Sequence, residues 1–291
     1  MTAFFGSPVD VRNRLATTGY LTDDAIATTV FLADALGKPL LVEGPAGVGK
    51  TELAKAVAAS TGSELVRLQC YEGLDEARAL YEWNYKKQLL RIQAAGADPS
   101  APPQAWEQTH DDIFAEEFLL ERPLLAAIRR TEPTVLLIDE IDKTDVEVEG
   151  LLLEVLSDYQ VTIPELGTVV AARTPFVVLT SNAARELSEA LKRRCLYLHL
   201  DYPAPERERD IVLARVPGIE ADLAEQLVRT VGTLRALEIK KAPSIAETID
   251  WARTLLALGL DNLDEEAVAQ TLGVVLKHVS DQTRAVKELG L

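Results

Sequence analysis

One stretch of this chain combines glycines, a lysine and a hydroxyl at the spacing of a phosphate-binding loop, between an apolar run and a helix-forming segment. The glycines let the backbone curl, so that several N–H groups point inward and bind phosphate at the start of a helix. The lysine adds a cation for the β- and γ-phosphates, and the threonine hydroxyl suits the Mg²⁺ that accompanies them. The loop residues are Gly44, Pro45, Ala46, Gly47, Val48, Gly49, Lys50 and Thr51, and Glu52 follows as a further nucleotide-binding candidate.

A second set of candidates follows the apolar run 135–138, which ends in Asp139 and Glu140. A pair of carboxylates at a strand tip belongs at the carboxyl edge of a parallel sheet, where open α/β folds bind ligands. We expect Thr51 to ligate Mg²⁺, Asp139 to hold the ion through its water shell, and Glu140 to orient a water molecule towards the terminal phosphate of ATP. This pairing favours hydrolysis over transfer of phosphate to a small metabolite.

Two further groups of polar residues come later in the chain. Asn182 follows the apolar run 176–179, where its amide could bind both the attacking water and the γ-phosphate. Ser-Asn after a strand is also ordinary turn chemistry. Arg193 and Arg194 end a predicted helix, a position that the helix macrodipole favours for cations. The functional alternative is an arginine finger that reaches the phosphate of a neighbouring subunit, which requires an oligomer.

The segment before the loop predicts two short helices. Thr22 or Asp23 can cap a helix over 24–36, and Gly37 can end it. Tyr20 precedes this helix, close enough in sequence to the loop to supply an apolar wall for a nucleotide base. Ordinary core packing of Tyr20 is the alternative interpretation.

The elements that carry the polar residues alternate between strand and helix patterns. Residues 71–115 interrupt this alternation and predict an insert, with a polar helix that carries Tyr81, Trp83, Tyr85, Lys86 and Lys87 and a Pro- and Ala-rich stretch over 94–105. Apolar strands that alternate with helices indicate a parallel sheet covered on both faces. The expected strands are 64–70, 134–139, 175–181 and 195–200, the expected helices are 118–130, 146–159 and 184–192, and a hairpin is expected over 161–170.

Everything after Pro205 is helix-patterned. We therefore predict an α/β protein of two domains. Residues 1–203 form a P-loop nucleotide-binding domain with a parallel sheet between helices, including the N-terminal helices and the insert near 71–115. Residues 204–291 form a small all-helical lid.

Composition limits the function classes. The 291 residues carry a formal net charge of −16, which argues against nucleic acid as the main partner. No apolar run approaches the roughly 18–20 residues that span a bilayer, and the N-terminus lacks a basic segment before an apolar core, so we expect a cytoplasmic protein. Cys70 and Cys195 adjoin apolar runs, which favours buried reduced thiols over a metal or disulfide site.

Taken in order, the segments 44–51, 136–140, 180–182 and 193–194, followed by a helical lid, resemble an AAA+ ATPase. The insert, the hairpin over 161–170 and the segment 191–195 are similar to the MoxR group, and most similar to its CoxD-like members, which are associated with maturation of molybdenum-containing carbon monoxide dehydrogenases. The resemblance implies Walker roles for Lys50, Thr51, Asp139 and Glu140, a first-sensor role for Asn182, and a finger role for Arg194 with Arg193 in support.

The resemblance also implies assembly and partners. Members of the group typically form hexameric rings, work with a protein that bears a von Willebrand factor A domain, and use ATP to remodel or load metal into a client enzyme. One departure concerns the lid, where Ser244 stands at the position of the second-sensor arginine and Lys240 or Lys241 could replace it. Tyr71 resembles the aromatic residue of a pore loop, with loop packing as the alternative.

The function that we expect is ATP hydrolysis coupled to maturation of a client metalloenzyme, with ATP and Mg²⁺ as cofactors. A scaffold gated by nucleotide, in which hydrolysis is incidental, is the first alternative. A DNA-acting AAA+ ATPase is the second, and the acidic charge balance counts against it.

Overall fold

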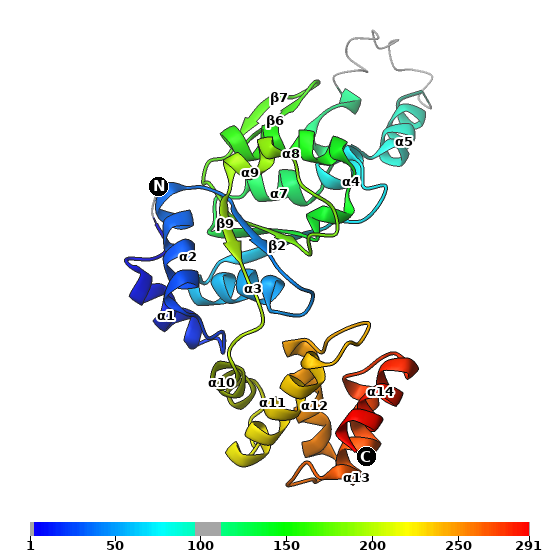
Figure 1. Ribbon diagram of the computed structural model, residues 1–291. Coiled ribbons are helices and arrows are strands. Elements are labelled where there is room, and N and C mark those ends of the chain that lie inside the picture. Colours follow the sequence, from blue (N-terminus) through cyan, green and yellow to red (C-terminus); the bar gives the residue numbers. More distant parts are fainter. Residues whose placement is uncertain (1–2, 97–111, 291) are drawn as a thin grey trace.

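The computed structural model describes residues 3–96 and 112–290. Its centre is a five-stranded parallel sheet with strand order β2-β5-β8-β1-β9, and helices cover both faces (Figure 1). The polar residues that follow the strands therefore meet at one edge. The strands are β1 Leu40–Glu43, β2 Glu64–Gln69, β5 Thr134–Asp139, β8 Phe176–Ser181 and β9 Leu196–His199.

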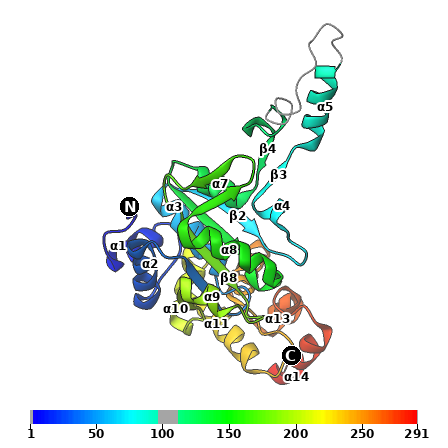
Figure 2. The same ribbon diagram turned by 90° about the horizontal axis from the view of Figure 1, so that it is seen from above.

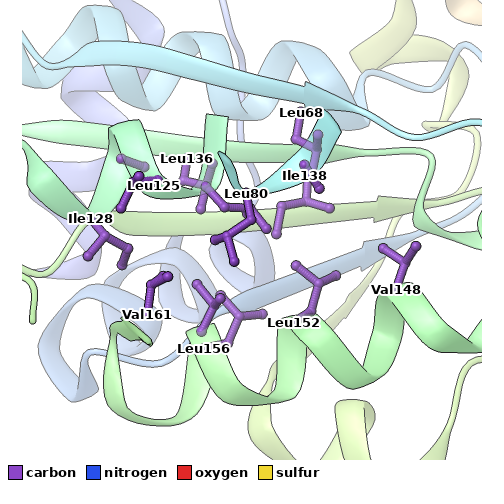
Figure 3. Packing of buried hydrophobic residues seen from close by; sticks show 14 of the residues in the cluster. Leu68, Leu80, Leu125, Ile128, Leu136, Ile138, Val148, Leu152, Leu156 and Val161 are labelled. Carbon is purple, nitrogen blue, oxygen red and sulfur yellow. The ribbon is translucent and has the colours of Figure 1, made fainter. Parts of the chain in front are cut away.

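The central strands β1, β5 and β8 are largely apolar and buried, as expected of parallel strands covered on both faces, whereas the edge strands β2 and β9 are partly exposed. In β5 all six residues are buried, and their side chains alternate between two cores. Val135 and Leu137 pack with helices α1 to α3, whereas Leu136 and Ile138 pack with α7 and α8 on the other face (Figure 3). This arrangement confirms the predicted α/β fold class.

Helix α2, Asp24–Leu36, begins and ends at the residues that the sequence indicated. Asp23 caps α2 by accepting a hydrogen bond from the Ile26 amide at 2.8 Å, and Gly37 ends α2 in the left-handed conformation. Gly62 ends the helix that follows the loop in the same way. The helices are α1 Pro8–Ala16, α2 Asp24–Leu36, α3 Lys50–Thr61, α7 Pro123–Arg129, α8 Val146–Asp158 and α9 Glu189–Arg194.

The insert differs from the prediction. Tyr81 and Trp83 are not helical but lie in strand β3, Tyr81–Trp83, which pairs antiparallel with β4, Leu119–Glu121. The predicted helix over 118–130 therefore shrinks to α7, because its first residues form β4. Two helices flank β3, α4 Glu76–Ala79 and α5 Tyr85–Gly96, and α5 projects from the body (Figure 2). Of the predicted Pro- and Ala-rich stretch, residues 97–105 lie outside the described residues.

The hairpin is confirmed, whereas the helix predicted over 184–192 is partly wrong. Strands β6, Gln160–Ile163, and β7, Gly167–Val170, pair antiparallel. Residues before α9 are not helical because two carboxylates on neighbouring segments bind their backbone amides. Asp142 accepts from the amides of Asn182 and Ala184, and Glu149 accepts from that of Ser188.

The chain after β9 is helical, as predicted, and packs around its own core, in which Trp251 is fully buried. Ile245 and Ile249 also reach the apolar cluster of the α/β body. Among the described helices, none is long and apolar enough to cross a membrane. These helices are α10 Pro205–Arg215, α11 Ala221–Ala236, α12 Ile245–Ala257, α13 Glu265–Thr271 and α14 Val279–Leu289.

Both cysteines are free and buried, as predicted. Burial raises the pKa of the Cys70 and Cys195 thiols to about 12. At neutral pH neither thiol ionises, so neither is reactive.

Candidate functional site

The loop between β1 and α3 has a backbone that requires glycine. Gly44, Gly47 and Gly49 all have positive φ angles, of 154°, 77° and 102°. A Cβ on Gly44 would overlap the carbonyl oxygen of Leu200 in the segment after β9. The loop is therefore held against the edge of the sheet, and α3 begins at Lys50 with its first amides directed at the loop.

Lys50 and Asn182 come together beneath this loop. The buried Lys50 ammonium donates to the carbonyl oxygens of Gly44 and Pro45 at 2.6 and 2.7 Å and to Oδ1 of Asn182 at 2.8 Å. Burial lowers the pKa of Lys50, and the nearby carboxylates, Asp142 and Asp139 first, oppose that shift. The cation and the amide predicted from distant parts of the sequence thus share one site.

Asp139 forms a cluster of oxygen atoms with two hydroxyls. Its carboxylate is 3 % exposed, and its Oδ1 accepts from Oγ1 of Thr51 at 2.9 Å and from Oγ1 of Thr180 at 2.6 Å. Thr51 and Asp139, the two predicted metal ligands, are therefore in direct contact. Carboxylate and hydroxyl oxygens are the donors that Mg²⁺ prefers, so this set fits that ion.

Glu140 lies beside Asp139 in a strained backbone conformation. Its φ of 59° is in the left-handed region, and its amide donates to Thr180 Oγ1 at 2.9 Å. Its carboxylate accepts from Gln69 Nε2 at 2.8 Å and from Lys143 Nζ at 2.7 Å. A non-glycine residue in this region costs about 1–3 kcal/mol, a strain that is common at functional sites.

Sequence reasoning missed two residues of β2 that contact the acidic pair. Arg67 Nη2 lies 2.5 Å from Oδ2 of Asp139, and Gln69 binds Glu140. The signal was present, because residues two apart in a strand share a face and this strand ends beside the strand that carries Asp139. The unpredicted Lys143, from the turn after β5, also binds Glu140.

A cavity of about 670 Å³ opens in front of these residues. Tyr20 lines it, as expected of a base-contacting residue, and its ring would lie 3.6 Å from a Cβ on Gly49. Burial raises the pKa of Tyr20, so its hydroxyl stays protonated. Glu52 also lines the cavity and pairs with Lys55 and Arg215.

The helical part of the chain supplies a second wall that sequence reasoning did not identify, with Arg207, Arg215 and Ile249 among its residues. Arg207 pairs with Asp23, and Arg215 pairs with Glu52, so both arginines join α10 to the body. Cations and apolar side chains of this wall suit a molecule that combines phosphates with a base.

The start of α12 contacts the loop directly. The amide of Ala246 donates to the Gly47 carbonyl oxygen at 3.3 Å, and a Cβ on Gly47 would lie 2.5 Å from Cβ of Ser244 and closer still to its Oγ. Lys240 and Lys241, the candidate substitutes for a second-sensor arginine, do not line the cavity, and Lys241 binds Glu247 at 2.7 Å.

Arg193 and Arg194 are exposed and lie outside the cavity of their own chain. Arg194 donates from Nε to Ser157 Oγ at 2.6 Å and from Nη1 to the Ala190 carbonyl at 3.0 Å. Tyr71 is 41 % exposed in the turn after β2, and Arg78 donates to its hydroxyl at 3.4 Å. The finger and pore-loop roles of these residues stay predictions.

The chain is similar to several known proteins. Residues 39–195 match the family model of the AAA domain, dynein-related subfamily. Protein NorQ of Paracoccus denitrificans is 25 % identical over 78 % of this chain and 76 % of its own length. Chaperone protein ClpB 2 of Parasynechococcus marenigrum is 38 % identical over 48 % of this chain and 13 % of its own length. A solved structure of the RuvB Holliday junction branch migration motor of Thermotoga maritima has a TM-score of 0.46 against this chain. The two are 20 % identical, and the match covers 99 % of this chain and 83 % of that chain.

Proposed function

This chain belongs to the dynein-related subfamily of AAA domains and is an AAA+ ATPase of the MoxR type, and we propose that it hydrolyses ATP to remodel or activate a client metalloenzyme. The observation that carries the proposal is the meeting of four residues from three segments: the start of α3, the end of β5 and the turn after β8. Lys50 contacts Asn182 at 2.8 Å, and Thr51 contacts Asp139 at 2.9 Å, all beneath one phosphate loop.

Each residue has a role that follows from its chemistry. The loop amides and Lys50 bind and neutralise the phosphates. Thr51 and Asp139 would hold Mg²⁺, which supplies further positive charge to the phosphates when bound. The Glu140 carboxylate separates from Gln69 and Lys143 and then accepts a proton from the attacking water. Asn182 orients that water by a hydrogen bond.

The assembly that we propose is a homo-oligomeric ring, with six subunits as the expected number. Arg194 does not reach the cavity of its own chain, which is consistent with a finger that acts on a neighbour's phosphate, supported by Arg193. Residues 204–291 would serve as a lid that moves against the body of residues 1–203 during turnover. Contacts of α12 with the loop give this motion a direct route to the nucleotide.

The proposed client is a metalloenzyme, with a molybdenum-containing carbon monoxide dehydrogenase as the first candidate. The proposed partner carries a von Willebrand factor A domain. The sequence resemblance to CoxD-like proteins supports both, and the similarity to a chaperone protein supports a remodelling activity.

The test compares wild type with Glu140→Gln in nucleotide binding, phosphate release and client activation. We expect the variant to bind ATP normally and to lose at least about 100-fold in turnover, because general base catalysis contributes about that factor or more. Client activation should fall with turnover. Full client activation by a variant that binds but does not hydrolyse ATP would instead favour the nucleotide-gated scaffold.

The finger is tested by mixing two inactive proteins, Arg194→Ala and Lys50→Ala. In a mixed ring, an intact phosphate loop from the first protein meets an intact arginine from the second, so some ATPase activity should return. Native mass spectrometry can confirm that mixed rings form. Mixed rings without recovered activity would count against a finger in trans.

A further inference from the structure

Arg67 places a protein cation on the carboxylate that is expected to bind the metal. Its Nη2 donates a charge-assisted hydrogen bond to Asp139 Oδ2 at 2.5 Å. The Asp139 side chain is 3 % exposed, whereas that of Arg67 is 47 % exposed. A buried anion is thus neutralised by a cation that is half in solvent.

The remaining oxygen of Asp139 is also in use. Oδ1 accepts hydrogen bonds from the hydroxyls of Thr51 and Thr180, whereas Oδ2 accepts from Arg67. These partners fill three of the about four acceptor positions of the carboxylate, and a metal ion that approaches Oδ2 is repelled by Arg67 until the guanidinium moves away. The two threonines are short side chains on buried elements, which leaves Arg67 as the partner that can move.

The contacts of Arg67 leave it free to move. Within the described residues, only its Nη2 donates hydrogen bonds, to Asp139 and to Oε1 of Gln69. Its other nitrogens form no hydrogen bond or ion pair within that part of the chain, and the side chain lines the nucleotide cavity. Because the Arg67 end of the pair is half in solvent, water can solvate its guanidinium when a divalent ion takes its place at Asp139.

We propose that Arg67 is a positioning residue that neutralises Asp139 in the absence of metal and competes with the divalent cation for this carboxylate. The proposal rests on the nucleotide and Mg²⁺ site of the proposed function. Arg67 sets the Mg²⁺ concentration above which the site takes up a nucleotide–metal complex. Below that concentration it keeps the buried carboxylate in place for the next nucleotide.

The test measures binding of a fluorescent ADP analogue, mant-ADP, as MgCl₂ is raised from zero. In Arg67→Gln, we expect the Mg²⁺ concentration at half-maximal enhancement of binding to fall about fivefold, because the competing cation is gone and both threonine hydroxyls remain. Arg130→Gln is the matched control. It removes an arginine that pairs with Glu64 at the opposite end of β2, so its midpoint should equal that of wild type.

Two outcomes would overturn the proposal. An unchanged or higher Mg²⁺ midpoint in Arg67→Gln means that Arg67 does not compete with the metal. A loss of metal-free mant-ADP affinity with an unchanged midpoint would make Arg67 a phosphate ligand instead. If Arg67→Gln does not fold, Arg67→Lys decides, with an expected decrease of about twofold, because the lysine ammonium is more strongly hydrated and lacks the planar fork of the guanidinium, and an unchanged midpoint again refutes competition.

The same titration separates this proposal from the proposed function. If wild type shows no enhancement of mant-ADP binding by Mg²⁺, the nucleotide–metal site itself is wrong. If wild type responds and Arg67→Gln does not shift, only the role of Arg67 fails.

Discussion

Replacement of Gly47 by alanine tests how closely α12 and the phosphate loop are packed. A Cβ at this position would lie 2.5 Å from Cβ of Ser244 and closer still to its Oγ, and the backbone φ is +77°. Overpacking costs about 1–3 kcal/mol, and a left-handed backbone costs an alanine about 1–2 kcal/mol more. We therefore expect Gly47→Ala to lower the free energy of unfolding by about 2–5 kcal/mol.

A matched control and a double substitution separate these two costs. Gly62 has a similar φ of +64°, but nothing lies within 4 Å of a Cβ built there. Gly62→Ala should therefore lower the free energy of unfolding only by the cost of the left-handed backbone. Ser244→Gly removes the clashing atoms and is mild by itself, since glycine is tolerated at a helix N-cap. In the Ser244→Gly background, Gly47→Ala should cost only about 1–2 kcal/mol.

The assay is urea denaturation, followed by circular dichroism and by tryptophan fluorescence, with coincident transitions required before free energies are compared. The reasoning is refuted if Gly47→Ala is as costly with Ser244→Gly as without it. It also fails if Gly47→Ala and Gly62→Ala are equally destabilising, because the contact with α12 would then contribute nothing.

Three further predictions concern buried polar groups. Glu208 is 1 % exposed, and Arg235 binds it bidentately at 2.5 and 2.8 Å. Arg235→Met leaves this buried carboxylate without its cation, so it should lower the free energy of unfolding of the helical part in urea by about 3–5 kcal/mol. A loss below about 1 kcal/mol would contradict this. Cys70 and Cys195, whose pKa burial raises to about 12, should resist a thiol reagent at pH 8 until urea is added, and stability should fall as pH rises above about 9, where unfolded thiols ionise first. Rapid labelling of native protein would argue against buried thiols. Although burial opposes ionisation, hydrogen bonds lower the pKa of Glu149. Glu149→Gln should therefore lower the free energy of unfolding by about 1–3 kcal/mol at pH 7, and this difference should shrink as pH falls below about 4, where wild type also loses the charge. A difference that does not change with pH would point to packing instead.

The sheet could be predicted because each of its strands carries its own signal. Residues 135–138 are all apolar, and the strand predicted around them, 134–139, has the bounds that the structure shows. The insert could not be predicted in the same way. Tyr81–Trp83 becomes a strand only by pairing with Leu119–Glu121, and local periodicity cannot reveal a partner that distant. Likewise, the segment before Glu189 is held by carboxylates from other elements, which no local pattern shows.

The site was predicted where parallel strand ends bring residues together. Thr51 and Asp139 meet because the loop follows one strand and the carboxylate ends another, a rule that needs only the fold class. Arg67 was missed although its strand was predicted, because an arginine on a strand face usually faces solvent. The contact between α12 and Gly47 depends on how the helices dock on the body, which sequence patterns do not specify.

The strand order determines when the nucleotide site can form during folding. Among the described residues, β1, the strand that precedes the phosphate loop, pairs with β8 and β9. Glu43 in this strand lies 138 positions before Ser181 and 154 positions before Tyr197. The loop itself rests on Leu200, just beyond β9. A nascent chain that has passed its own loop therefore lacks the strands that hold it, and contacts this distant in sequence form slowly. Nucleotide binding should begin only after residues near 200 have been synthesised, so ATP can stabilise the folded body but cannot guide its earliest steps.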